Sequence, residues 1–416
     1  MWLRRERLVT FPVQRSIMKS IDIVIIGAGL YVCGKGTPGY GTILPAVFEW
    51  VRQGANINSV HCVATSGKSA KQLSQKASEL IEKTGVTVDV RSYPETDEYD
   101  SAAYQKVLSL VEGPACAIVA VPDHLHHEVS KHCLEAGLHT LVVKPLTPTL
   151  AEGLDLRNIA KEKQLYGAVE FHKRWDKSNL ILKDKIRSGS IGAPLNCWIE
   201  YSQRKTIPLS FFKDWASKTS ILQYLGVHYI DLIRFATSAL PRRVMAIGQK
   251  TELANQGIDT YDAIQCVIDW QMQDGQSFTE TILTSWVDPN SSTAMSDQKI
   301  KFVGTKGRYE ADQKERGIRI NTDEAGVEHI NPDFSMPYGT QNGNVSWRGY
   351  GIDSVTAFFS DVADLETGHT SLELLNEVRP TFQEALISTM VVEAAHLSLE
   401  NGSSWQSIDS TQIGID

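Results

Sequence analysis

Short apolar runs alternate with longer segments of helical spacing in the first part of the chain. The apolar runs are IDIVIIG, SVHCVATS, ACAIVAVP, HTLVVKP and YGAVEF. Segments such as AKQLSQKASELIEKTG and HHEVSKHCLEAGLH lie between these runs. Nearly continuous apolar strands joined by helices are typical of a parallel sheet that is covered on both faces. The pattern therefore predicts a doubly wound α/β domain over residues 20–171.

The pattern changes to strict alternation of apolar and polar positions after residue 174. It is seen in LNCWIEYSQR, RRVMAIGQKTEL, YDAIQCVIDWQMQDG, SFTETILTSWV, QKIKFVGTKGRYEAD and GIRINTD. Alternation with tight turns predicts a largely antiparallel sheet with one face exposed or docked. The segment NEVRPTFQEALISTMVVEAAHLSLENG predicts a helix pair that closes this second α/β domain, over residues 172–416.

Length and composition agree with two domains and exclude several classes of protein. The chain has 416 residues, of which 42% are hydrophobic, and single cores rarely grow beyond about 250 residues. A formal charge of −8 argues against nucleic acid as a partner. No apolar run reaches the ~20 residues of a membrane span, so we expect a protein without membrane contact. The six cysteines are scattered singly, so we expect reduced thiols and a cytoplasmic location. We expect residues 1–19 to be a disordered extension.

A glycine turn follows the first predicted strand, in the stretch GAGLYVCGKGTPGYG. Gly27 permits a tight strand-to-helix turn, and Gly29 lets the backbone approach a pyrophosphate at the start of the next helix. The sixth position of the usual fingerprint is Val32, and the piece from Gly34 to Gly41 looks inserted before the helix. The turn predicts a Rossmann dinucleotide site.

The end of the second strand indicates which dinucleotide is preferred. An acid at this place binds the ribose hydroxyls of NAD, whereas this chain reads VATSGKSAK. Hydroxyls and the cations Lys68 and Lys71 could receive a 2′-phosphate. The sequence therefore favours NADP over NAD.

Charged residues end two of the later apolar strands. Lys144 directly follows Val143, and Pro145 then stiffens the exit from the strand. One strand earlier, Pro122 and Asp123 occupy the same place. Ligands of an open parallel sheet bind beyond the carboxyl ends of its strands, so we expect Lys144 to face the cofactor and Asp123 to lie near the nicotinamide ribose.

These motifs occur in an order that resembles a known family. Gly27-x-Gly29 is followed by VPDHLHHEVSKHCLEAGLHTLVVKP, VEFHKRW, GVHYIDL, VGTKGRYEADQ and RPTFQEAL. This order resembles the glucose–fructose oxidoreductase and inositol dehydrogenase (Gfo/Idh/MocA) family over nearly everything after residue 20. The resemblance implies a Rossmann domain, a second domain with a large open sheet, and homodimers or homotetramers built on that sheet.

The resemblance also implies roles for individual residues. The family's Glu-Lys-Pro motif falls on Val143-Lys144-Pro145, so Lys144 takes the catalytic role. The family's acid four residues before a histidine falls on YLGVH, where His228 matches and Tyr224 replaces the acid. The expected cofactor-binding residues are Gly27, Gly29, Leu30, Tyr31, Thr65, Ser66, Lys68, Pro122, Asp123, His126 and Lys144.

Oxidation of a secondary alcohol needs a base that takes the hydroxyl proton while hydride leaves for the nicotinamide. We expect His228 to be the base, because its ordinary pKa near ~6.5 suits both directions. Lys144 would polarise the same oxygen, with a pKa lowered by neighbouring cations. Tyr224 would join by a neutral hydrogen bond, one helical turn away.

Further candidates surround this centre. The fifth apolar run is followed by His172, Arg174 and Trp175. These side chains fit a hydroxylated and even an anionic substrate, because an aromatic ring stacks on a sugar face and a guanidinium binds a carboxylate. Trp215 and Trp347 are weaker candidates for stacking. The cluster HLHHEVSKH lacks the spacing of a zinc helix, so no metal site is expected.

Three functions compete on these grounds. The favoured one is an NAD(P)-dependent dehydrogenase or reductase of a sugar, polyol or sugar derivative. The second is an NAD-dependent glycoside hydrolase that oxidises a sugar carbon transiently. The third is a non-catalytic dinucleotide sensor, which the replacements Val143 and Tyr224 would favour but the presence of Lys144 and His228 opposes.

Overall fold

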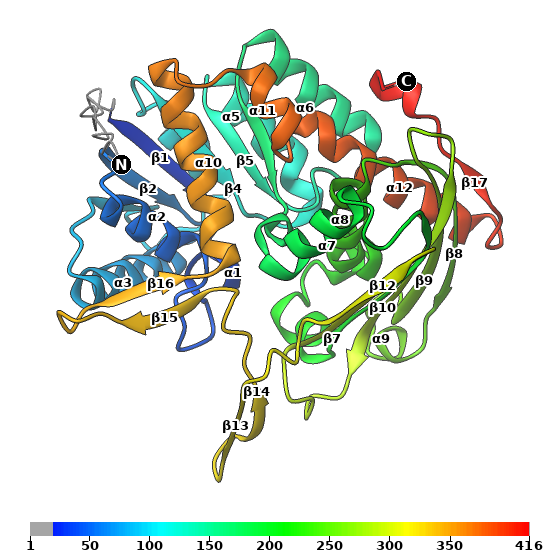
Figure 1. The fold of residues 1–416 in the computed structure, drawn as a ribbon. Helices are drawn as coiled ribbons and strands as arrows, with labels where there is room; N and C mark the ends of the chain where they lie inside the picture. The colour runs from blue at the N-terminus through cyan, green and yellow to red at the C-terminus, as the bar shows by residue number, and fades with distance from the viewer. Residues whose placement is uncertain (1–19, 416) are drawn as a thin grey trace, which may run out of the picture.

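The first domain is a six-stranded parallel sheet with helices on both faces (Figure 1). The computed structural model describes residues 20–415, and the extension expected over residues 1–19 lies outside them. The sheet order is β3-β2-β1-β4-β5-β6, which is the doubly wound Rossmann order. The strands are β1 (Ile21–Ile26), β2 (Ile57–Val63), β3 (Val90–Tyr93), β4 (Ala115–Val119), β5 (His139–Val143) and β6 (Gly167–Glu170). Five of them match the apolar runs; β3 was not predicted, because this short strand is only half-buried and carries polar residues.

The helices of this domain begin and end at recognisable signals. Ser66 caps α3 by accepting a hydrogen bond from the Ser69 backbone N–H, and Gly85 ends the helix in the left-handed conformation. Thr149 and Glu152 form a capping box on α6. The helices are α1 (Leu30–Cys33), α2 (Ile43–Arg52), α3 (Gly67–Thr84), α4 (Ala103–Leu108), α5 (His126–Glu135) and α6 (Leu150–Glu162). The piece from Gly34 to Gly41 is an excursion between α1 and α2, as the sequence suggested.

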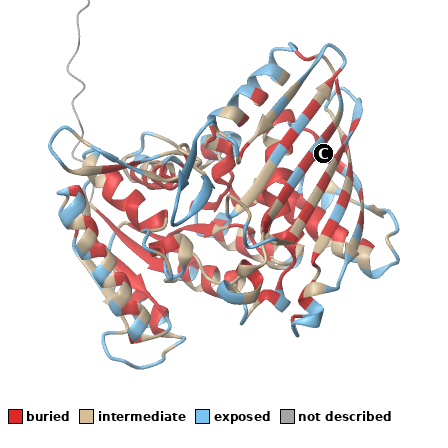
Figure 2. Cartoon of the chain, turned by 90° about the horizontal axis from the view of Figure 1, so that it is seen from below, coloured by how far each residue is buried: buried red, intermediate tan, exposed pale blue. Residues whose placement is uncertain are grey.

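The second domain is a seven-stranded sheet whose order is β12-β11-β7-β10-β9-β8-β17. All neighbours are antiparallel except β7 and β10. The strands are β7 (Pro194–Arg204), β8 (Leu240–Gln249), β9 (Ala263–Gln271), β10 (Ser277–Asp288), β11 (Ser296–Gly304), β12 (Gly307–Asp312) and β17 (Gln406–Ser407). Buried and exposed residues alternate along them (Figure 2), so one face is packed and the other is open.

Helices cover the packed face of this sheet. They are α7 (Lys177–Arg187), α8 (Val227–Thr237) and α12 (Phe382–Glu400), with the short α9 (Glu252–Asn255) at one end. The C-terminal helix pair is α11 (Leu372–Val378) followed by α12, broken at Pro380, which confirms the expected pair. Single-turn 3₁₀ or π segments are η1 (Asp123–Leu125), η2 (His172–Trp175), η3 (Ile207–Phe211), η4 (Ala216–Lys218), η5 (Leu222–Gly226) and η6 (Ser410–Ile413).

A crossing segment, residues 313–367, returns from the second sheet to the first domain. It contains β13 (Arg319–Thr322), β14 (Gly326–His329), β15 (Met336–Gly339), β16 (Val345–Arg348) and α10 (Tyr350–Thr367). The hairpin β13–β14 projects from the molecule (Figure 1), so the expectation that GIRINTD joins the large sheet is wrong; its two strands pair with each other, and most of their residues are exposed.

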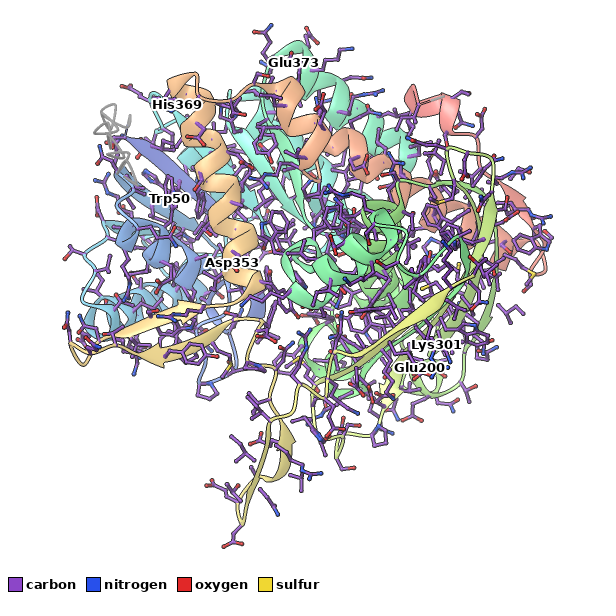
Figure 3. The ribbon with its side chains drawn as sticks, in the orientation of Figure 1. Trp50, Glu200, Lys301, Asp353, His369 and Glu373 are labelled. Carbon is purple, nitrogen blue, oxygen red and sulfur yellow. The ribbon has the colours of Figure 1, made fainter. Side chains whose placement is uncertain are left out.

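The far end of the crossing segment is part of the first domain's core. The Trp50 ring of α2 packs 5.1 Å from the Phe359 ring of α10, and its Nε1 donates to Ser360 Oγ at 3.1 Å (Figure 3). Asp353 lies in the first turn of α10. The first domain is therefore closed by residues that come late in the chain.

All six cysteines are buried and unpaired, which confirms the expected free thiols. Among the helices that the structure describes, none is both long and apolar enough to cross a bilayer.

Candidate functional site

Lys144 lies immediately beyond β5 and is buried. Its Nζ donates to the Tyr224 backbone carbonyl at 2.6 Å and lies 3.5 Å from the centroid of the Tyr224 ring. Burial lowers the pKa of Lys144 to about 8, while Asp123 and Glu170 act in the opposite direction. The expectation that neighbouring cations lower this pKa is therefore wrong; the cause is loss of water around the amine.

Tyr224 lies in the π turn η5, directly before α8. Such wide turns occur often at functional sites, and here the turn directs both a carbonyl and an aromatic face at Lys144. Burial raises the pKa of Tyr224 further above its ordinary value, so the phenol stays neutral. Its contact with Lys144 uses the ring face and the carbonyl rather than the expected hydroxyl.

His228 lies in the first turn of α8 and is 2% exposed. Among the residues that the structure describes, its buried Nδ1 has no hydrogen-bond partner. Burial lowers the pKa of His228 well below its usual range, and positive charge on His172, Lys144 and Lys173 lowers it further. The expectation of an ordinary pKa near neutrality is wrong for this imidazole.

Glu170 is a site residue that sequence reasoning missed. It ends β6, beside β5, and is 2% exposed. Its Oε2 accepts from His172 Nδ1 at 2.9 Å, and its Oε1 accepts from Ser354 Oγ at 2.5 Å. The signal was present: like Lys144, Glu170 is a charged residue at the end of an apolar strand.

His172 contacts groups from several parts of the chain. Its ring centroid lies 4.5 Å from that of His228, and aromatic rings of Tyr31, Phe334 and Tyr350 lie within 6.2 Å. Tyr31 belongs to α1, whereas Phe334 and Tyr350 belong to the crossing segment. The structure thus brings together the expected Lys144, Tyr224, His228, His172 and Tyr31.

The glycine turn has the shape that a dinucleotide requires. Gly27 has a φ of +124°, and a Cβ there would lie 2.1 Å from the Ala120 carbonyl oxygen. A Cβ on Gly29 would meet no heavy atom within 4 Å. The backbone at Gly29 is therefore open to a ligand, and Leu30 follows as the first residue of α1. This room fits a bound pyrophosphate.

The residues expected to bind the adenosine ribose lie together at the end of β2. Thr65 and Lys68 are exposed, and Ser66 is occupied in capping α3. Sequence reasoning missed Lys35, whose Nζ donates to Ser69 Oγ at 3.1 Å. The inserted piece thereby adds a second lysine near this strand end.

The expected cofactor residue Asp123 is engaged in contacts with other side chains. Asp123, which follows Pro122, is buried and accepts hydrogen bonds from Thr219 Oγ1 at 2.7 Å and Gln223 Nε2 at 3.0 Å. Its carboxylate therefore joins the two domains.

His126 also has a structural place. Its Nδ1 lies 2.7 Å from the Pro145 carbonyl and its Nε2 lies 3.0 Å from the Val121 carbonyl. It fastens the backbone next to Lys144.

Arg174 does not face a substrate, contrary to expectation. It is buried, and its Nε and Nη2 donate to Asp231 at 2.8 and 2.6 Å. Trp175 was expected to be a stacking platform, but it lines a small cavity together with Tyr166 and Phe358, and the Arg379 guanidinium lies 5.9 Å from its ring centroid. The Arg174 guanidinium is therefore held within the second domain, by Asp231 of α8.

The other tryptophan candidates differ in position. Trp347 is buried in the first domain's core, so it is not a platform. Trp215 stays beside the site, with its ring centroid 6.1 Å from that of Tyr224.

The histidines of HLHHEVSKH point to different partners. His127 Nε2 lies 2.8 Å from Asp155, and His132 Nδ1 lies 2.8 Å from the Tyr104 hydroxyl. Within residues 20–415, no three or more His, Cys, Asp or Glu side chains are placed to hold a metal ion.

Comparison with curated proteins finds partial matches. The chain is 30% identical over 135 residues to a scyllo-inositol 2-dehydrogenase (NADP(+)) of Bacillus subtilis, covering 32% of this chain and 38% of that one. It is 25% identical over 231 residues to a myo-inositol 2-dehydrogenase of Thermotoga maritima, covering 54% of this chain and 65% of that one. The chain thus spans less than two thirds of either relative.

Solved structures share the fold over nearly the whole chain. An inositol dehydrogenase homolog from Azotobacter vinelandii, complexed with NADH and myo-inositol, matches with a TM-score of 0.69 and 16% identity, covering 94% of this chain and 98% of that one. A myo-inositol 2-dehydrogenase from Lactobacillus plantarum matches with a TM-score of 0.66 and 16% identity, covering 94% and 100%. These likenesses confirm the expected fold.

Two family models match consecutive parts of the chain. Residues 21–171 match the oxidoreductase family with an NAD-binding Rossmann fold. Residues 180–310 match the GFO/IDH/MocA C-terminal domain. The chain therefore belongs to the Gfo/Idh/MocA family of oxidoreductases.

Proposed function

We propose that this protein is an NAD(P)-dependent dehydrogenase or reductase that acts on a secondary hydroxyl or carbonyl of a polyol, sugar or sugar derivative. The observation that carries the proposal is the buried Lys144, with a pKa lowered to about 8 and a charge that acts on His228, whose ring centroid lies 4.5 Å from that of His172. A bound nicotinamide supplies the hydride acceptor or donor in such a reaction. The residues of this chain must then bind the alcohol, orient it and move its proton.

Lys144 would bind and polarise the reacting oxygen. Its contact with the Tyr224 carbonyl fixes the amine, and two carboxylates near it, Asp123 and Glu170, favour its charged form. The backbone at Gly27 and Gly29 would hold the pyrophosphate.

The substrate class follows from what surrounds the amine. Rings of Trp215 and Phe212 pack with Tyr224 and could stack on the C–H face of a cyclic polyol. The named inositol dehydrogenases among the relatives support a cyclic polyol as the first candidate.

The test is a panel of inositols, aldoses, uronic acids and sulfonated sugars assayed at 340 nm with NAD and NADP. Net reduced nicotinamide from at least one polyol or sugar is expected, with turnover lost and cofactor affinity retained in Lys144→Ala. No turnover across the panel, with NAD copurifying in stoichiometric amount, would overturn the proposal and favour transient oxidation or a sensor. Retained turnover in Lys144→Ala would remove Lys144 from the site.

We further propose that NADP is the preferred cofactor. At the end of β2 the chain has no carboxylate in residues 65–68, and it presents the exposed Lys68 with Lys35 nearby. These amines would pair with a 2′-phosphate. Lys68→Ala should weaken NADPH binding more than NADH binding, as measured by fluorescence titration. Lys71→Ala is the matched control, because Lys71 already pairs with Asp97 at 2.8 Å; equal loss for both cofactors in Lys68→Ala would contradict the preference.

We also propose a homodimer or homotetramer built on the open face of the second sheet. That face carries the exposed Trp198 of β7 together with charged residues such as Glu200 and Lys301 (Figure 3). Trp198→Glu should reduce the mass measured by light scattering. Leu110→Glu, at an exposed leucine of the first domain, should leave it unchanged; a wild-type monomer would refute the proposal.

A cytoplasmic location is part of the same proposal. Six free cysteines in the described chain suit a reducing compartment.

A further inference from the structure

We propose that His172, oriented by Glu170, is the group that exchanges a proton with the substrate, and that His228 binds the substrate without acting as the base. This inference rests on the proposed function, and it assigns a residue pair that the fold alone does not.

His172 is oriented by a carboxylate. A carboxylate only accepts hydrogen bonds, so the 2.9 Å contact assigns the proton to His172 Nδ1, donating to Glu170 Oε2. Nε2 is then left as a proton acceptor. In many enzymes a catalytic histidine that acts as a base is oriented in this way by a buried carboxylate.

Glu170 is itself held firmly in place. It is almost fully buried, and its other oxygen accepts from Ser354 Oγ of α10 at 2.5 Å. The Tyr31 hydroxyl lies 3.4 Å from His172 Nδ1, and the nearby Glu170 charge contributes to raising the pKa of Tyr31, although burial is the larger cause. Glu170 is therefore fixed by the first domain and by the crossing segment together.

His228 has no comparable carboxylate partner among the described residues. Its Nδ1 has no partner among the described residues, and the acid that would orient it is replaced by Tyr224, which contacts Lys144 instead. Positive charge on His172, Lys144 and Lys173 opposes a proton on this ring. A neutral imidazole in such surroundings can donate or accept one hydrogen bond to a substrate hydroxyl, but it is a poor base.

The substrate loses a proton from oxygen and a hydride from carbon. In the oxidation direction, the substrate O–H bond breaks, its proton goes to Nε2 of His172, and its electron pair becomes the second C–O bond. The C–H bond breaks at the same carbon, and its electron pair leaves as hydride to the oxidised nicotinamide, which is the co-reactant. Titratable groups that face His172 are Glu170, His228, Tyr31 and Tyr350.

The test compares His172→Gln with His228→Gln in the full-length protein. His172→Gln should lower kcat by about 10²–10⁴-fold, the usual contribution of a general base, and should remove the acid limb of the pH profile. His228→Gln should chiefly raise KM and keep that limb. His127→Gln, which changes a histidine of α5 that pairs with Asp155 of α6, should change neither.

Glu170→Gln tests the positioning role. Without the carboxylate, the imidazolium of His172 is less stable, so the acid limb should move to lower pH while KM changes little. Glu170→Asp should restore part of the wild-type profile. An unchanged limb in Glu170→Gln would overturn the role of Glu170.

A readout without turnover completes the design. Nitrogen-15 NMR of labelled histidines, assigned with His172→Gln and His228→Gln, should show the His172 ring protonated at Nδ1; a ring protonated only at Nε2 would overturn the inference. An active wild type whose His172→Gln variant keeps its rate and its acid limb would also overturn it, with the proposed function intact. A wild type that turns over nothing in the substrate panel overturns the proposed function, and the catalytic role of His172 with it.

Discussion

Replacing Arg174 by alanine should destabilise the protein rather than weaken substrate binding. The sequence predicted that Arg174 binds the substrate. In the structure Arg174 is buried, and its Nε and Nη2 donate to the Asp231 carboxylate at 2.8 and 2.6 Å. Removing one partner of a buried ion pair costs about 3–5 kcal/mol, because the other charge stays buried without its partner. Side-chain exposures of 5% and 2% place this pair in that class.

The loss of stability in Arg174→Ala can be measured by urea unfolding. With a slope of about 3 kcal/mol per M, a loss of about 3–5 kcal/mol lowers the unfolding midpoint by about 1–1.7 M. The double variant Arg174→Met with Asp231→Leu should recover most of that loss, because an apolar pair of similar volume is often neutral in place of a buried ion pair.

The sign of the pH dependence follows from Asp231. Burial raises the pKa of Asp231 above its ordinary value even though Arg174 opposes the shift. Without Arg174 this pKa rises further, and a protonated Asp231 costs less to bury than an ionised one. The difference between wild type and Arg174→Ala should therefore be larger at pH 8 than at pH 5. An unchanged midpoint together with a raised KM would refute this reasoning and return Arg174 to the substrate.

Two further predictions concern the cofactor end and the lysine. Burial lowers the pKa of Lys144 to about 8, so wild-type turnover should fall as pH rises above about 8, where the polarising charge is lost. Lys144→Arg should move this decline in turnover to higher pH. If the decline does not move, it belongs to the titration of another group. Gly27→Ala should destabilise the first domain, since its Cβ would lie 2.1 Å from the Ala120 carbonyl, whereas Gly29→Ala, with open space around its Cβ, should keep the thermal midpoint but weaken dinucleotide binding in a fluorescence titration. Equal midpoints for the two glycine variants would contradict the steric argument.

The sequence predicts the sheet of the first domain well because its strands are buried on both faces. Their apolar runs are therefore nearly continuous, and β3 escapes detection because it lies at the sheet edge and is only half-buried. The position of Lys144 follows from the same reasoning, since a charged residue after such a run must lie at the carboxyl edge of the sheet. Glu170 satisfies the same rule one strand away.

Side-chain partners far apart in sequence could not be predicted. Arg174 and Asp231 are separated by 57 positions, and a terminal arginine after an apolar run looks the same whether it meets a substrate or a buried carboxylate. The pKa of His228 likewise depends on burial and on neighbouring charges that no local pattern records. The rings of Phe334 and Tyr350 reach the site only because the chain crosses back.

The crossing segment delays completion of the first domain's core during synthesis. The core of the first domain includes Trp347, Ile352, Val355, Phe359 and Val362, which are translated long after the six strands that they cover. A ribosome must therefore release most of the polypeptide before this apolar surface is sealed from water. A fragment ending at residue 171 would expose the surface permanently, and such a patch promotes aggregation. Dissecting the protein into independent halves at that point would thus separate a core from its own cover.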